Sequence, residues 1–239
     1  MPVKTLSKQT TPLQEPLFTG ALSLLIALHF FGFLGMISPF MQDTLNALTP
    51  FDSFTELTPL NLLLTSTILL LFHQEWNRNA ISFLAISFLI GYWVEVAGVQ
   101  TGLLFGEYTY GEMLGWKAFG VPFTIGLNWM MLTYSIAASV QQIISKLQLN
   151  YLPLTKALIA ALLMMLTDVL IEPVAIHLDF WHWLSPDIPL QNYLMWFIVA
   201  FGLSYLYYKL PFQKENPIAI FVFLSQVFFF IAHHLYMLS

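Results

Sequence analysis

The sequence predicts an all-α protein, a polytopic membrane helix bundle with about seven transmembrane helices. Of its 239 residues, 58% are apolar and only 9% are charged, whereas average globular chains carry about 25% charged residues. Apolar stretches of about 20 residues recur along the chain, and a helix of that length crosses a hydrocarbon core of roughly 30 Å. This pattern argues against a soluble domain and indicates an integral membrane protein.

Seven spans are expected in order, and polar or glycine-rich segments separate them. The first follows a polar, Thr-rich segment, residues 1–16, which we expect to be a loosely ordered tail. No linker and no internal repeat divides residues 17–239, so a single transmembrane domain is expected. The expected spans cover residues 17–41, 58–73, 79–105, 120–144, 155–178, 190–210 and 217–238.

The few Lys and Arg residues lie at the ends of the expected spans and predict the orientation of the chain in the membrane. Seven of the eight Lys and Arg residues precede span one or follow spans two, four and six: Lys4, Lys8, Arg78, Lys146, Lys156, Lys209 and Lys214. Lys117, after span three, is the eighth. Short cytoplasmic loops keep an excess of Lys and Arg. We therefore expect a multi-pass protein of the cell membrane with its N-terminus in the cytoplasm and its C-terminus outside.

Composition also excludes several classes of function. The chain has no cysteine, which excludes a disulfide framework, a thiolate metal site and a cysteine nucleophile. Its single arginine and scarce lysines argue against a nucleic acid partner and against large phosphorylated substrates, which need several cations to hold them.

Three acids lie within the expected spans, where ionisable groups are costly and usually face a bundle interior or a wet cavity. Glu95 is late in span three, and Asp168 and Glu172 are late in span five, four residues apart and so on one helix face. At about 1.5 Å per residue, all three reach one level in the outer half of the membrane, and Asn128 reaches the same layer. Crowded carboxyls in a low dielectric resist ionisation, so one can donate a proton while another accepts one.

The outer loops add glycines and aromatic residues. Five glycines between spans three and four indicate backbone turns with positive φ or close packing. Aromatic residues at a membrane surface usually form an interfacial belt, and this interpretation is favoured for Trp181 and Trp183. If their rings lined the site instead, they could stabilise a developing cation.

Two blocks of residues, within positions 93–197, form a recognisable pattern: Glu95, Gly98, Thr101, Gly102, Phe105, Gly106, Tyr108, Tyr110, Gly120 and Pro122 in the first, and Asp168, Glu172, Pro173, Trp181, Trp183, Pro189, Asn192 and Trp196 in the second. In this order the blocks resemble the carotenoid biosynthesis membrane proteins, whose members include carotenoid 1,2-hydratases. Two positions depart from the pattern: Glu172 stands where many members have Asp, and Met195 where Gly commonly precedes the Trp.

The resemblance implies a hydratase that needs no cofactor and no metal, and that adds water across the terminal C1,C2 double bond of an acyclic carotenoid end group. Asp168 would donate the proton, Glu95 or Glu172 would receive one from water, and Asn128 would orient that water. The carotenoid would come from the lipid phase, with membrane lipids and other enzymes of the pathway as partners. The expected substrate-binding residues are Asn128, Trp129, Thr101, Tyr108, Tyr110, Trp181, Trp183, Asn192 and Trp196.

Competing functions remain open at this point. A membrane di-iron oxygenase would give a similar product, but the six histidines lack its repeated spacing. A retinal protein needs a lysine in span seven, which has none, and a magnesium pyrophosphate site needs more Asp-rich motifs and nearby cations. The main non-enzyme alternative is a small proton-coupled transporter that uses the same acids as a relay, although such carriers commonly show internal repeats.

Overall fold

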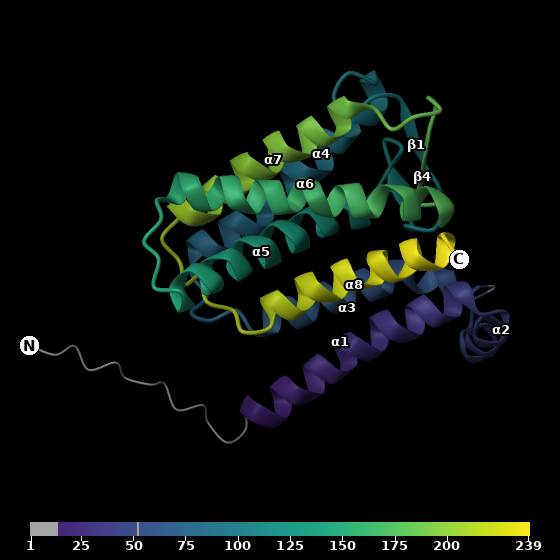
Figure 1. Ribbon diagram of the computed structural model, residues 1–239, viewed down its shortest axis with the longest axis horizontal. Helices are drawn as coiled ribbons and strands as arrows, with labels where there is room; N and C mark the ends of the chain where they lie inside the picture. The colour runs from purple at the N-terminus through teal and green to yellow at the C-terminus, as the bar shows by residue number, and fades with distance from the viewer. Residues whose placement is uncertain (1–13, 52) are drawn as a thin grey trace, which may run out of the picture.

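The computed structural model describes residues 14–51 and 53–239, and most of them are helical (Figure 1). The expected tail lies mainly outside the described residues, and the first helix begins at Gln14. The helices are α1 Gln14–Ile37, α2 Pro39–Leu48, the 3₁₀ helix η1 Phe54–Leu57, α3 Thr58–Leu71, α4 Arg78–Thr101, α5 Phe123–Lys146, α6 Pro153–His177, α7 Leu190–Lys209 and α8 Ala219–Met237.

Helix α5 forms the centre of the bundle. It packs against α3, α4, α6, α7 and α8, and most of its residues are buried. Small side chains on this helix, Ser135, Ala137, Ala138 and Ser139, let neighbouring helices approach closely, as is typical of packing between membrane helices. By contrast, α1 lies at the edge of the bundle beside α8 and α3 (Figure 1).

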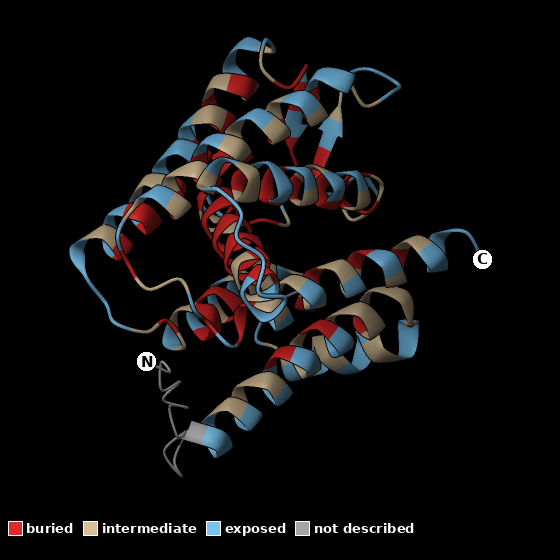
Figure 2. Ribbon diagram, turned by 60° about the vertical axis from the view of Figure 1, so that its left-hand side comes forward, coloured by how far each residue is buried: buried red, intermediate tan, exposed pale blue. Residues whose placement is uncertain are grey.

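Many large apolar side chains on the surrounding helices are exposed, while buried positions concentrate toward the interior (Figure 2). Large exposed apolar patches are rare on soluble monomers. Six helices of the described chain are long and apolar enough to cross a membrane, if η1 and α3 are counted as one helix. The sixth expected span, α7, is also a continuous helix of 20 residues but falls outside that set of six. The chain is thus an all-α polytopic membrane protein, as the sequence predicts.

The ends of three expected spans differ from the structure. The first span was expected to continue to Met41, but α1 ends at Ile37, where Ser38 caps a separate helix that begins at Pro39. The third ends at Thr101 because Gly102 adopts φ 66°, so Phe105 lies in a loop. The fourth begins at Phe123, since the residues before it form a strand.

Two short antiparallel ladders, which are not predicted from the sequence, lie at the ends of the helices. Strand β1 (Tyr108–Tyr110) pairs antiparallel with β4 (Trp181–Trp183), and β2 (Lys117–Ala118) pairs with β3 (Val121–Pro122). The predicted role of the five glycines in this region is confirmed. Four have positive φ, and the fifth, Gly111, packs so closely against Asp179 that a Cβ would lie 2.0 Å from its carbonyl oxygen.

Candidate active site at the ends of α4, α5, α6 and α7

Glu95 is buried on α4 and accepts three hydrogen bonds. Its Oε2 accepts from the hydroxyls of Tyr108, at 2.5 Å, and Tyr110, at 2.8 Å. Its Oε1 accepts from the indole Nε1 of Trp129 on α5, at 2.9 Å. A buried carboxylate requires such donors, because burial removes the water that would otherwise solvate its charge. These bonds hold Glu95 in one orientation between two helices and a strand.

The pairing of β1 with β4 explains why four aromatic side chains meet the acids. Tyr108 lies opposite Trp183, and Tyr110 lies opposite Trp181. Successive side chains of a strand point to opposite faces. Both tyrosines and both tryptophans therefore share the inner face of the ladder, and the residue between each pair points outward.

Tyr108 and Tyr110 act as permanent donors. Burial raises the pKa of both hydroxyls well above the ordinary value for tyrosine, and the charge of Glu95 raises it further. Both hydroxyls therefore stay protonated at every pH near neutrality, and Glu95 keeps its two donors.

Asp168 and Glu172 lie one turn apart on α6 and share a partner on α7. The Nδ2 of Asn192 donates to Asp168 Oδ2 at 2.8 Å and to Glu172 Oε1 at 3.0 Å. The indole Nε1 atoms of Trp181 and Trp183 donate to Glu172 Oε2 at 3.0 and 2.8 Å. Glu172 thus accepts three hydrogen bonds, whereas Asp168 accepts one.

The second oxygen of Asp168 is unusual. Its Oδ1 is fully buried and has no hydrogen-bond partner among the described residues. A bare buried charge is costly, and two neighbouring carboxyls resist simultaneous ionisation. We therefore expect the Asp168–Glu172 pair, which shares the donor Asn192, to hold one proton. Glu95 shares none of its three donors with another carboxyl and is therefore suited to remain a carboxylate.

Two of the three acids border a small cavity of about 20 Å³, which is room for about one water molecule. Glu95, Glu172 and Asn128 line this cavity, but Asp168 does not. Aromatic rings form most of the other walls, including Trp196, whose ring stacks on that of Trp129 with centroids 4.4 Å apart.

A larger cavity adjoins the small one. Its volume is about 310 Å³, and its lining is mostly apolar. The two cavities share Ile125, Asn128 and Trp181. Glu95 and Glu172 therefore lie on a small cavity beside a larger apolar one, and the amide of Asn128 borders both.

Most sequence-predicted site residues meet in this cluster, with one exception. Thr101 is exposed at the end of α4, where its hydroxyl donates to the carbonyl oxygen of Ala97 at 2.6 Å. The belt interpretation of Trp181 and Trp183 is wrong, because both indole N–H groups bind Glu172.

Sequence reasoning assigned no site role to four polar residues that line the larger cavity: His29 on α1, Thr58 and Asn61 on α3 and Gln226 on α8. All four lie in spans one, two and seven, outside the blocks that carry the family resemblance. A polar side chain inside an apolar span is costly, so the argument that identified Glu95 could also have found these residues.

Fold and site together define a class: a polytopic helical membrane protein with a buried cluster of carboxyls, phenols, indoles and amides. Such groups can transfer protons and orient water. Among the described residues, no group of three or more His, Asp or Glu side chains is arranged to hold a metal ion.

The chain belongs to the carotenoid biosynthesis protein family, whose model matches residues 58–238. This match confirms the resemblance seen in the sequence. A curated relative, the bisanhydrobacterioruberin hydratase of Haloarcula japonica, is 30% identical over 145 residues, which make up 59% of this chain and 48% of the relative. The chain thus spans about half the length of the curated relative that it matches. No solved structure matches it.

Proposed function

We propose that the protein is a carotenoid hydratase that adds water across the terminal C1,C2 double bond of an acyclic end group and forms a tertiary alcohol. The observation that carries this proposal is the position of Glu95 and Glu172 on one small cavity that shares lining residues with a larger apolar one. An acid and a base then flank a space for water, beside a space for hydrocarbon. Membership of the family and the name of the curated relative support this reading.

Protonation of the alkene is the first step. The Asp168–Glu172 pair holds the proton, and Glu172 delivers it because Glu172 lines the cavity whereas Asp168 does not. This assignment differs from the sequence-based one, in which Asp168 itself meets the substrate. The electron pair of the C1=C2 bond forms the new C2–H bond and leaves a positive charge on tertiary C1. Nearby indole rings and carboxylates stabilise that charge.

Water then attacks C1, and the new C–O bond forms as the water loses a proton to Glu95. The amide of Asn128, which borders both cavities, orients this water. After the step Glu95 is protonated and the Asp168–Glu172 pair lacks one proton, so a proton must return to the pair before the next turnover. The sum is one water added to one alkene, and no electrons are exchanged.

Co-expression tests the proposal. In a host that makes lycopene or γ-carotene, the protein should yield a product heavier by one water, and its new oxygen should come from labelled water rather than from labelled O₂. The Glu95→Gln and Glu172→Gln variants should lose about 10²–10⁴-fold in rate, the usual range for general acid–base catalysis. Unchanged pigments, or oxygen that derives from O₂, would contradict the proposal.

We also propose that the N-terminus is cytoplasmic and that the membrane is the cell membrane. The distribution of the cations supports this orientation, with seven of eight on one side of the expected spans. A reporter fused after Ser239 should be active outside the cytoplasm, and activity only in the cytoplasm would reverse the topology.

A further inference from the structure

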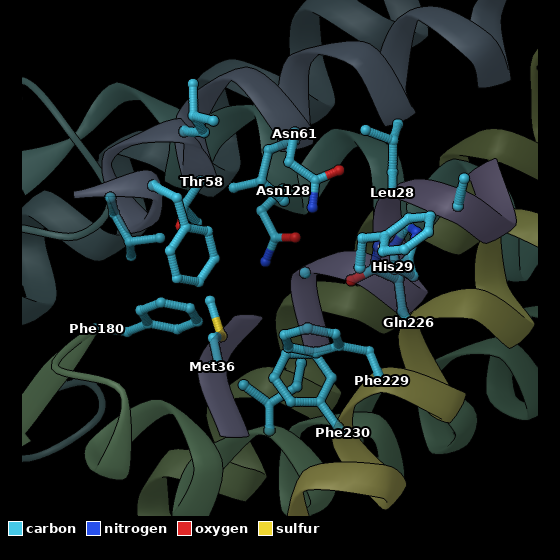
Figure 3. A pocket seen from close by; sticks show the side chains of 18 of the residues that line it. Leu28, His29, Met36, Thr58, Asn61, Asn128, Phe180, Gln226, Phe229 and Phe230 are labelled. Carbon is cyan, nitrogen blue, oxygen red and sulfur yellow. The ribbon is translucent and has the colours of Figure 1, made fainter. Parts of the chain in front are cut away.

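The larger cavity lies between the peripheral helices α1, α3 and α8 and the central helix α5 (Figure 3). Its volume of about 310 Å³ is at the lower end of the range for ligand pockets, about 300–1,000 Å³. It can therefore enclose part of a long molecule rather than the whole. Apolar side chains from several elements form most of its wall, among them Leu28, Met36, Phe54, Phe180, Phe229 and Phe230.

The polar groups of this cavity show which kind of ligand it suits. His29 and Gln226 satisfy each other, since Gln226 Nε2 donates to His29 Nε2 at 2.8 Å while His29 Nδ1 donates to the carbonyl oxygen of Leu25 at 2.9 Å. Among the described residues that line the cavity, none is Asp, Glu, Lys or Arg. Such a wall excludes a charged solute and suits a hydrocarbon.

Two residues of α1 show where this cavity meets the outside. Leu24 and Phe31 line the cavity and are 47% and 48% exposed, and their helix lies at the edge of the bundle (Figure 1). In a membrane, that edge faces lipid. A hydrocarbon chain can therefore reach the cavity from the bilayer, beside α1, without passing through water.

We propose that this cavity binds the isoprenoid segment next to the reacting double bond of a polyene hydrocarbon, and that the chain enters sideways from the lipid past α1. The inference rests on the proposed function, which places the terminal double bond at Glu95 and Glu172. The shared lining residues Ile125, Asn128 and Trp181 connect the two spaces. The amides of Asn61 and Asn128 project into the cavity (Figure 3), close to where water must meet the alkene.

Gly32 offers a way to fill the cavity without disturbing the acids. It lines the cavity on α1, and a Cβ at this position would meet only Phe229 Cε2, at 3.9 Å. A large side chain at residue 32 would therefore extend into the space that the ligand needs. Gly20, on the same helix, is exposed, does not line the cavity and has nothing within 4 Å of its Cβ position, so the same substitution there is a matched control.

The experiment uses the full chain in lipid nanodiscs with lycopene as the probe, and follows binding by the shift of the polyene absorption. Gly32→Phe should weaken lycopene binding at least tenfold and reduce turnover in the co-expression assay, and Gly32→Leu should have an intermediate effect. Gly20→Phe should stay within twofold of the wild type in both assays. Thermal unfolding shows whether Gly32→Phe is folded. If it is not, lycopene binding and turnover of the milder Gly32→Leu variant decide the test.

The two proposals can fail separately. If both Gly32 variants bind and hydrate lycopene as the wild type does, the cavity is not the binding site, although the hydratase proposal stands. If the wild type binds lycopene through Gly32-sensitive contacts but never yields a hydrated product, the proposed function is wrong and the binding site stands. If the Glu95→Gln variant binds lycopene normally and fails only in turnover, binding and chemistry are assigned to separate parts of the site, as we expect.

Discussion

The Nδ2 of Asn192 lies 2.8 Å from Oδ2 of Asp168 and is the one hydrogen-bond donor to that carboxyl within the described chain. The same nitrogen donates to Glu172 at 3.0 Å, so both of its hydrogens are used. Asn192 therefore fixes the separation of two carboxyls that would otherwise repel each other when charged.

Replacement of Asn192 by Leu should destabilise the protein and nearly abolish turnover. Loss of a donor to buried polar groups costs about 1–3 kcal/mol per group left unsatisfied, and two carboxyls are affected. Thermal unfolding in detergent and the hydration assay measure the two effects. Gln191→Leu is the control, because Gln191 is the exposed neighbour. An Asn192→Leu variant as stable and active as the control would contradict this role.

The two tyrosines that bind Glu95 should act non-additively. Tyr108→Phe and Tyr110→Phe each remove one donor from the same oxygen of Glu95, which costs about 1.5–3 kcal/mol for a bond to a charged group. The double variant leaves that oxygen without either donor. Its loss in the free energy of unfolding should therefore exceed the sum of the losses in the two single variants. Thr109→Val, on the exposed face of the same strand, should change the free energy of unfolding little. Additive effects would show that the two hydroxyls do not share one charged acceptor.

The sequence predicts the acids better than it predicts their surroundings. Glu95, Asp168 and Glu172 stand out because ionisable residues in apolar spans are costly, and helical spacing places two of them on one face. The strands that supply their donors are three residues long and pair across more than 70 positions of the chain. Tyr-x-Tyr and Trp-x-Trp do show the period of a strand, but nothing local indicates that these two segments pair with each other.

Trp183 and His182 provide a test of the inner and outer faces of β4. Trp183→Phe keeps an aromatic ring but removes the indole N–H that donates to Glu172 at 2.8 Å. We expect turnover to fall at least tenfold, because Glu172 loses one of three donors that set its position and charge. His182→Ala should leave turnover unchanged, since His182 points outward and pairs with Asp179 at the exposed surface, where ion pairs contribute little. If His182→Ala lost more turnover than Trp183→Phe, the assignment of the inner and outer faces of β4 would be wrong.

Gly91 sets the distance between α4 and α5 at the site. A Cβ at Gly91 would lie 2.3 Å from Cβ of Trp129, which is too close for either helix to tolerate without moving. Gly91→Ala should therefore destabilise the protein by about 1–3 kcal/mol, as overpacking usually does, and should displace Trp129 from Glu95. Gly202→Ala on α7 meets nothing within 4 Å and should be neutral or stabilising, because alanine favours helix by up to about 1 kcal/mol over glycine. Equal unfolding temperatures for the two variants would contradict close packing at Gly91.

Lys214, in the loop between α7 and α8, should make stability depend on pH. Its Nζ donates to the carbonyl oxygen of Leu210 at 2.8 Å and lies against the ring of Tyr207. Burial lowers the pKa of Lys214 from 10.5 to about 7 in the folded protein, and we expect this effect to outweigh the attraction of the ring face for the charged form.

The direction of the pH effect follows from proton binding. Between pH 7 and 10.5 the unfolded chain keeps the proton on this lysine while the folded chain loses it. The unfolded state then binds more protons, so the free energy of unfolding rises with pH across this window and is independent of this group below it. Thermal unfolding from pH 6 to 9.5 should show this rise in the wild type and in Lys209→Met, whose lysine is exposed in the last turn of α7. Lys214→Met should lack it, and a slope that Lys214→Met retains in full would mean that another group titrates.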